Sequence, residues 1–114
     1  MHEERPRRQQ KRLRLGGSVR LLIDTADGLV ITNGQIIDVS EGGCAVHVHR
    51  PIEANLVGRV SVEVAGQALG LPVRTRWSRA DTRGWIVGCQ FDRPTPEKLK
   101  AIRALMLERK KLTA

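Results

Sequence analysis

Two clusters of side chains in this chain of 114 residues have the chemistry to bind an anion. Residues 38–43 read DVSEGG and combine an acid, a hydroxyl and two glycines between two strand-like runs. Residues 7–12 read RRQQKR and are strongly basic. Guanidinium groups bind phosphate through paired hydrogen bonds, contact O6 and N7 of guanine, and stack on base planes. The two clusters together therefore fit one anionic ligand that carries guanine.

Each residue of the DVSEGG stretch has a role in such a site. The Asp38 carboxylate can accept hydrogen bonds from the N1 and N2 donors of a guanine edge, and the Ser40 hydroxyl can donate to a phosphate. Gly43 offers backbone with no side chain in the way. The alternative is a plain turn, folded by Asp38 and Ser40, in which Gly42 and Gly43 supply positive φ. The residue types alone leave both interpretations open.

Composition indicates one globular domain with an acidic partner. Hydrophobic residues make up 40% of the chain and aromatic residues only 3%, so Val, Ile and Leu must fill the core, which favours strands. The net charge of +8 favours a nucleotide, a nucleic acid, an anionic membrane or an acidic protein face. There is no secretory signal and no run approaching the roughly 20 apolar residues of a membrane span, so we expect a soluble, cytoplasmic protein. Cys44 and Cys89 are expected to be buried, reduced thiols.

The elements that must position the two clusters are short strands. Residues 1–17 form a basic arm with little to bury, residues 18–93 alternate like half-buried strands, and residues 94–114 form a helix. Two turn signals, Asp27-Gly28 and Asn33-Gly34, compete within a few residues. Farther along, Leu71, Val73, Thr75 and Trp77 fall on one strand face, and Gly88 indicates a bulge or a close backbone approach.

The helix has clear start signals. Thr95 is placed as the N-cap with Pro96 at the first helical position, and an apolar stripe follows at Leu99, Ile102, Leu105 and Met106. About six strands followed by one helix predict an all-β fold with one C-terminal helix. We expect a small six-stranded antiparallel barrel, because so short a chain could not protect the edges of two open sheets.

Other chemistry has little support in the sequence. His47 and His49 share one strand face, but no third ligand accompanies them, so we interpret them as a solvent-facing pair and expect no metal. No nucleophile with a neighbouring base and no paired carboxylates are present, so we expect neither an enzyme nor a cofactor.

Together the motifs resemble the PilZ domain family. RQQKR at residues 8–12 is similar to the family's RxxxR element, with Arg7 as a preceding extra arginine, and DVSEGG at residues 38–43 is similar to its [D/N]xSxxG element. GWIVGCQF at residues 84–91 resembles the family's penultimate strand, with Gly88 and Phe91 in register. The resemblance extends over the whole chain, since a C-terminal helix follows this strand.

The resemblance implies a six-stranded barrel that binds cyclic di-GMP, a bacterial second messenger. Ligand-binding roles carry over to Arg8, Arg12, Asp38, Ser40 and Gly43, and Arg7 implies an intercalated dimer of the dinucleotide. The ligand would order the arm over the barrel rim and change the surface that an unidentified protein partner contacts. A nucleic-acid-binding barrel and an interaction module that binds no ligand remain as alternatives. Nucleic acid is the less favoured partner, because Trp77, Trp85 and Phe91 sit in strand patterns typical of core residues.

Overall fold

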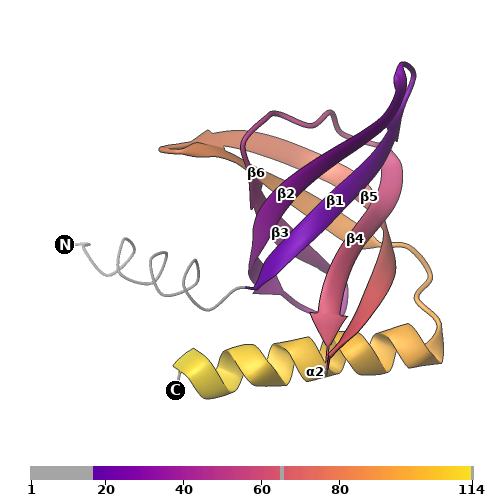
Figure 1. Ribbon diagram of the computed structural model, residues 1–114, viewed down its shortest axis with the longest axis vertical. Helices are drawn as coiled ribbons and strands as arrows, with labels where there is room; N and C mark the ends of the chain where they lie inside the picture. Colours follow the sequence, from indigo (N-terminus) through magenta and orange to yellow (C-terminus); the bar gives the residue numbers. More distant parts are fainter. Residues whose placement is uncertain (1–16, 65, 114) are drawn as a thin grey trace.

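The computed structural model describes residues 17–64 and 66–113, which form a closed antiparallel barrel and one helix (Figure 1). The strands follow the order β1-β2-β3-β6-β5-β4 around the barrel, and β1 pairs with both β2 and β4 to close it. This confirms the predicted fold class. The elements are β1 (Ser18–Thr25), β2 (Gly28–Val39), β3 (Gly43–Val48), β4 (Val57–Val64), β5 (Gln67–Asp81), β6 (Gly84–Phe91) and α2 (Pro96–Thr113).

Branched aliphatic side chains fill the barrel. Alternate positions of each strand point inward, so a period of two in the sequence becomes one continuous core. Closure leaves no unpaired edge between the first and last strands of the order, and this protects a small sheet from pairing with other chains. Side chains with no exposed surface include Leu21, Ile23, Val46, Val48, Val60, Leu71, Val73 and Val87.

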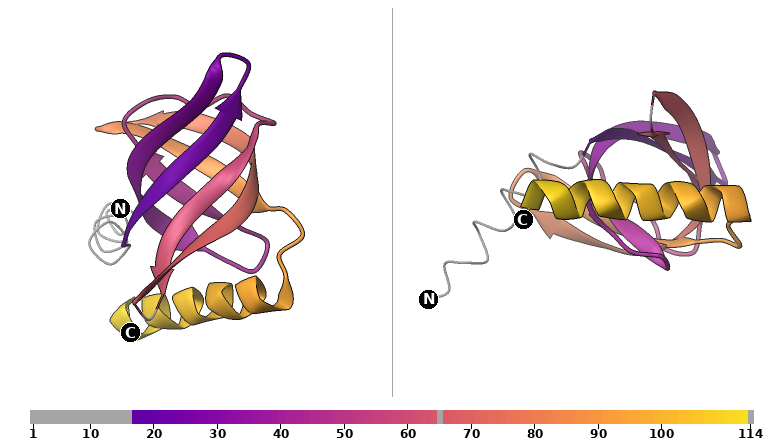
Figure 2. Two further views of the ribbon diagram at one scale, coloured as in Figure 1. Left: turned by 45° about the vertical axis from the view of Figure 1, so that its right-hand side comes forward. Right: turned by 90° about the horizontal axis from the view of Figure 1, so that it is seen from below.

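Helix α2 lies across one end of the barrel (Figures 1 and 2). Its start is as predicted, because the Thr95 hydroxyl accepts a hydrogen bond from the Lys98 amide at 3.2 Å. Ile102 is fully buried and Leu105 almost so, while Leu99 and Met106 pack against the core. The apolar stripe of α2 therefore covers the end of the barrel core. Among residues 17–64 and 66–113, no helix is long and apolar enough to cross a bilayer.

The path between β1 and β2 settles the competition between the two turn signals. The chain turns at residues 26 and 27, where Thr25 pairs with Gly28 and Gly28 has a φ of 118°. The Asn33-Gly34 signal does not turn. Gly34 lies inside β2 between β1 and β3, and a Cβ there would come within 2.9 Å of the Val48 side chain. Gly34 is therefore required for close packing inside β2, although the Asn33-Gly34 sequence resembles a hairpin turn.

The prediction that Trp77 faces the core is wrong. The pairing of β5 with β6 shifts register between Thr75 and Trp77, which marks a β-bulge. Leu71, Val73 and Thr75 are buried as predicted. The extra residue of the bulge then reverses which positions face outward, and Trp77 is 44% exposed. The fully buried Thr75 hydroxyl donates to the Glu53 carbonyl at 2.7 Å and accepts from the Leu56 amide at 2.9 Å. Thr75 therefore holds the 51–56 loop against β5.

The two histidines lie on the outer face of β3, but His47 is not solvent-facing. Its side chain is only 13% exposed, its Nε2 atom lies 3.5 Å from an Asp81 carboxylate oxygen, and its ring contacts that of His49 edge to face. No group of three His, Cys, Asp or Glu side chains in the described part of the chain is arranged to hold a metal ion.

Candidate functional site

One row of residues runs across four strands on the outer wall of the barrel. Asp38 of β2 pairs with Ala45 of β3, Ala45 pairs with Gly88 of β6, and Gly88 pairs with Trp77 of β5. The two middle residues have almost no side chain, so the wall is hollow between a carboxylate and an indole. A pocket of about 390 Å³ lies over this row, a size within the range of small-molecule sites.

Two β-bulges create this row. One shifts the register of β2 between Ile36 and Asp38, and the other shifts β5 between Thr75 and Trp77. A bulge inserts one residue into a strand and re-aims the side chains that follow it. Because the bulges flank β3 and β6 on opposite sides, they turn Asp38 and Trp77 outward at the same level. The site therefore depends on irregularities that a regular barrel would lack.

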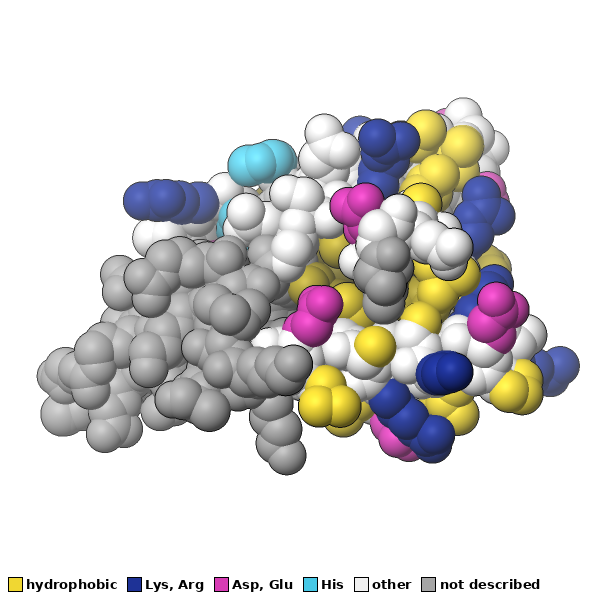
Figure 3. Space-filling view, turned by 60° about the horizontal axis from the view of Figure 1, so that its bottom comes forward, with side chains coloured by type: hydrophobic (Ala, Val, Ile, Leu, Met, Phe, Trp, Pro, Cys, Tyr) yellow, Lys and Arg dark blue, Asp and Glu magenta, His cyan; other side chains and the backbone are white. Residues whose placement is uncertain are grey.

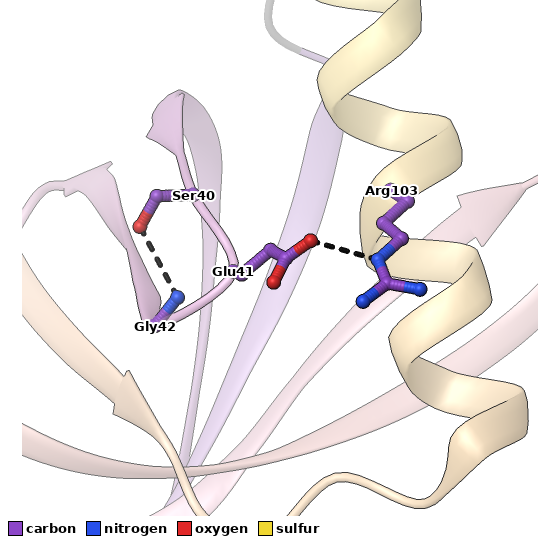
Figure 4. Close-up of polar contacts among 4 residues, drawn as sticks. All are labelled: Ser40, Glu41, Gly42 and Arg103. Carbon is purple, nitrogen blue, oxygen red and sulfur yellow. Dashed lines mark hydrogen bonds and ion pairs between the residues drawn. The ribbon is translucent and has the colours of Figure 1, made fainter.

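The loop after β2 is folded by Ser40. The Gly42 amide donates to the Ser40 hydroxyl at 3.3 Å (Figure 4), and the Ser40 amide donates to the Gly43 carbonyl at 2.8 Å. Ser40 therefore folds a turn, as one of the two interpretations of the sequence predicted. The alternative in which Gly42 and Gly43 supply positive φ is wrong on that point, because among the described residues only Gly28, Gly66 and Gly84 are glycines with positive φ.

Gly43 and Gly88 are required for space. A Cβ on Gly43 would collide with the carbonyl oxygen of Cys89, so β3 and β6 approach closely only because Gly43 has no side chain. A Cβ on Gly88 would collide with the indole ring of Trp77. The indole thus lies across Gly88, so the close approach at that residue is made by a side chain and not, as was predicted, by the backbone.

The β5 side of the pocket is basic as well as aromatic. Arg76, the extra residue of the bulge, lines the pocket beside Trp77. The guanidinium carbon of Arg79 lies 5.4 Å from the centre of the Trp77 ring, in a cation–π contact. An indole together with basic side chains suits a planar base attached to a phosphate.

Two thiols lie beneath the pocket. Cys44 and Cys89 are direct cross-strand partners, and both are buried and free of disulfides, as predicted. A hydrogen bond with Cys89, and then burial, raise the pKa of the Cys44 thiol well above its ordinary value. The raised pKa keeps the Cys44 thiol uncharged on the core side of the pocket.

The site loop is also linked to helix α2. The Arg103 guanidinium donates to the Glu41 carboxylate at 2.7 Å, and this ion pair raises the pKa of Arg103 (Figure 4). Both side chains are more than half exposed. The Glu41 side chain thus points toward the helix, whereas Ser40 folds the turn on the other side of the loop (Figure 4).

Of the predicted site residues, the structure brings together Asp38, Ser40 and Gly43 at the pocket. Arg7, Arg8 and Arg12 lie outside the described residues. The arm enters the barrel close to the site, because the Ile36 amide donates to the Gly17 carbonyl at 3.2 Å and Ile36 lies at the bulge that precedes Asp38.

Sequence reasoning missed Trp77 and Arg76 as residues of this site. A signal was available, since strict alternation from Leu71 onward would also place Arg79 and Asp81 inside the barrel. Two charged residues at inward positions require a change of register before residue 79, and that change is the bulge.

Comparisons with known proteins agree with the geometry. The sequence matches the model of the PilZ domain over residues 6–108. The fold is similar to the crystal structure of the PilZ domain of CeSA from a cellulose-synthesizing bacterium, with 23% sequence identity, a TM-score of 0.52, and coverage of 87% of this chain and 96% of that one. No curated protein matches the chain. Because the family model matches most of this chain and the chain folds as a closed barrel, the chain belongs to the PilZ domain family.

Proposed function

We propose that this chain is a cyclic di-GMP receptor domain. The observation that carries the proposal is the row from Asp38 to Trp77, which joins a carboxylate and an exposed indole across a floor made of Ala45 and Gly88. The carboxylate accepts hydrogen bonds from the donor edge of one guanine, and the indole offers its face to a base. The flat floor leaves room for a planar ligand between them.

Positive charge for the phosphates comes from two sides. Arg76 lines the pocket on the β5 side. The arm supplies Arg8 and Arg12, the pair that matches the family's RxxxR element. Gly17 lies five positions after Arg12, and a stretch of that length spans at most about 18 Å. Since Gly17 is hydrogen-bonded beside the β2 bulge, this reach extends over Asp38 and Ser40.

The response to the ligand is a change of surface rather than a reaction. Cyclic di-GMP bridges the pocket and the arm, fixes the arm over the barrel rim and neutralises part of its charge. A protein partner then meets a different surface. The ion pair of Glu41 and Arg103 gives the ligand-binding loop a direct contact with α2, so the helix belongs to the surface that responds.

Calorimetric titration with cyclic di-GMP tests the proposal, with GTP and linear pGpG titrated in parallel. We expect micromolar or tighter binding of the cyclic dinucleotide, worth about 8 kcal/mol or more. Arg8→Ala should abolish or greatly weaken it. The matched control is Arg83→Ala, at the exposed turn between β5 and β6, which should bind like the wild type. No heat with cyclic di-GMP, or equal loss in both variants, would contradict the proposal.

Stoichiometry tests the role of Arg7. Two dinucleotides per chain support an intercalated dimer, and an Arg7→Ala variant should then bind one. One dinucleotide per chain in the wild type removes this role.

A nucleic-acid-binding barrel is the second candidate. The exposed ring of Trp77 favours it, because bases of a nucleic acid stack on exposed aromatic side chains. The two functions differ in competition. Excess single-stranded nucleic acid should leave labelled cyclic di-GMP bound, because the carboxylate of Asp38 selects a base edge and repels a phosphate chain. Displacement of the label would favour the nucleic-acid function.

A further inference from the structure

A second surface lies on the barrel wall away from the pocket. Leu29 and Ile31 of β2 are each 55% exposed and Val57 of β4 is 44% exposed, while Leu22 of β1 is half-buried. Ile31 pairs directly with Leu22, whereas Leu29 pairs with Asp24, and Val57 precedes Gly58, the partner of Ile23. These four side chains, named here the hairpin patch, lie on three neighbouring strands, with Asp24 among them. Exposed apolar side chains that cluster in this way mark an interaction surface more often than scattered ones do.

Figure 3 shows exposed hydrophobic side chains on the barrel wall above the helix, with Lys and Arg beside them. The side chain of Arg59 on the neighbouring strand β4 does not cover the hairpin patch. Arg59 pairs with Leu22 through the backbone, but its side chain lies over Gly70 of β5, where its Cδ atom would be 3.2 Å from a Cβ. Because Gly70 has no side chain, Arg59 turns toward β5 and away from Leu22 and Ile31.

Two opposite charges border Leu22 along β1, and one of them, Asp24, also pairs with Leu29. Arg20 and Asp24 are exposed and lie on the same outward face as Leu22, two residues before and two residues after it. Two residues of a strand correspond to about 7 Å. Neither side chain forms an ion pair within the part of the chain that the structure describes.

The row of Leu22 and Ile31, with the two charges that border Leu22, is complementary to itself. A two-fold axis across β1 at Leu22 would bring Leu22 against its own copy and Ile31 against its own copy. The same rotation reverses the strand direction, so Asp24 of each copy would face Arg20 of the other. Isologous interfaces require this kind of self-complementarity, with an apolar centre and a polar rim.

We propose that the hairpin patch binds a second copy of this chain and forms a two-fold homodimer. An acidic or a basic partner protein would leave one of the two border charges facing its own sign, whereas a second copy pairs both. The ligand pocket lies over β3 and β6, and β6 is opposite β1 in the strand order. Both pockets of the dimer therefore stay open, and dimerisation does not depend on the ligand.

Sedimentation velocity of the full chain over a concentration series tests the dimer. We expect a reversible monomer–dimer equilibrium, with Ile31→Glu raising the dimer Kd by at least about tenfold. The matched control is Leu107→Glu on α2, where the side chain is 57% exposed, so the same chemical change should leave the equilibrium unaltered. Circular dichroism melting checks that both variants fold. A wild type that stays monomeric at every concentration overturns the proposal, and so does equal dissociation in the two variants.

Charge reversal tests the two-fold arrangement. Asp24→Arg and Arg20→Asp should each weaken the dimer, because each places like charges opposite one another in both symmetric contacts. The double variant should restore dimerisation toward the wild-type Kd, since the pairs are re-formed with their signs exchanged. A double variant weaker than either single variant would overturn this arrangement.

Discussion

Gly88 offers a sharp test of the proposed ligand site, because the atoms nearest to a methyl group there all belong to the indole of Trp77. A Cβ on Gly88 would overlap atoms Cε2, Nε1 and Cζ2 of Trp77. These atoms are the far end of a side chain that is 44% exposed, so the ring can rotate away into solvent. Gly88 does not have a positive φ, so alanine suits its backbone. Gly88→Ala should therefore displace the indole and leave the barrel folded.

The magnitude follows from what the indole contributes to binding. Stacking of one base on an aromatic side chain is worth about 1–3 kcal/mol. Its loss corresponds to a Kd for cyclic di-GMP that rises about 5- to 150-fold. Trp77→Ala removes the whole ring and sets the upper limit of the effect. Gly88→Ala should approach that limit without exceeding it.

A double-mutant cycle read by calorimetry separates displacement of the indole from any other effect of the methyl group. If Gly88→Ala acts through the ring, it should have no further effect on affinity in the Trp77→Ala background. The matched control is Gly70→Ala on β5 outside the pocket, where a Cβ would meet only the flexible side chain of Arg59, and its affinity should be unchanged. Free-energy losses that add in the double variant, or an unchanged Kd in Gly88→Ala, would refute the reasoning.

Two further predictions concern the folded barrel. Thr75→Val should lower the free energy of unfolding in urea by about 1–3 kcal/mol, since the Leu56 amide loses its buried hydroxyl acceptor and the Glu53 carbonyl loses a donor. Thr82→Val, at an exposed turn, should change it little, and equal stability of the two variants would contradict the role of Thr75. The Cys44 thiol should stay protonated in the folded state at a pH where it ionises in the unfolded chain, so the free energy of unfolding should fall as the pH rises past 9.0. Cys44→Ala should make that decline shallower in urea titrations, and an identical slope would show that another group causes it.

Much of the architecture could be predicted from the sequence because it depends on local patterns. Alternation of apolar residues predicted the strands, and the Thr95-Pro96 start with its apolar stripe predicted the helix. The DVSEGG stretch identified the loop where Asp38, Ser40 and Gly43 line the pocket. These features require only the geometry of a single strand, turn or helix, so a few neighbouring residues are enough to specify them.

The position of the site was decided by pairing between strands that are far apart in the sequence. Trp77 belongs to an apolar alternation, yet the bulge against β6 turns it outward and over Gly88. Gly43 and Gly88 were expected to matter for backbone conformation or approach, but only the facing strand shows what each would strike. Register is a relation between two strands, and a shift of one residue exchanges the inner and outer faces of everything that follows. The sequence by itself therefore determined a basic barrel with a glycine-containing loop after β2, whereas the tertiary structure decided which side chains that loop faces.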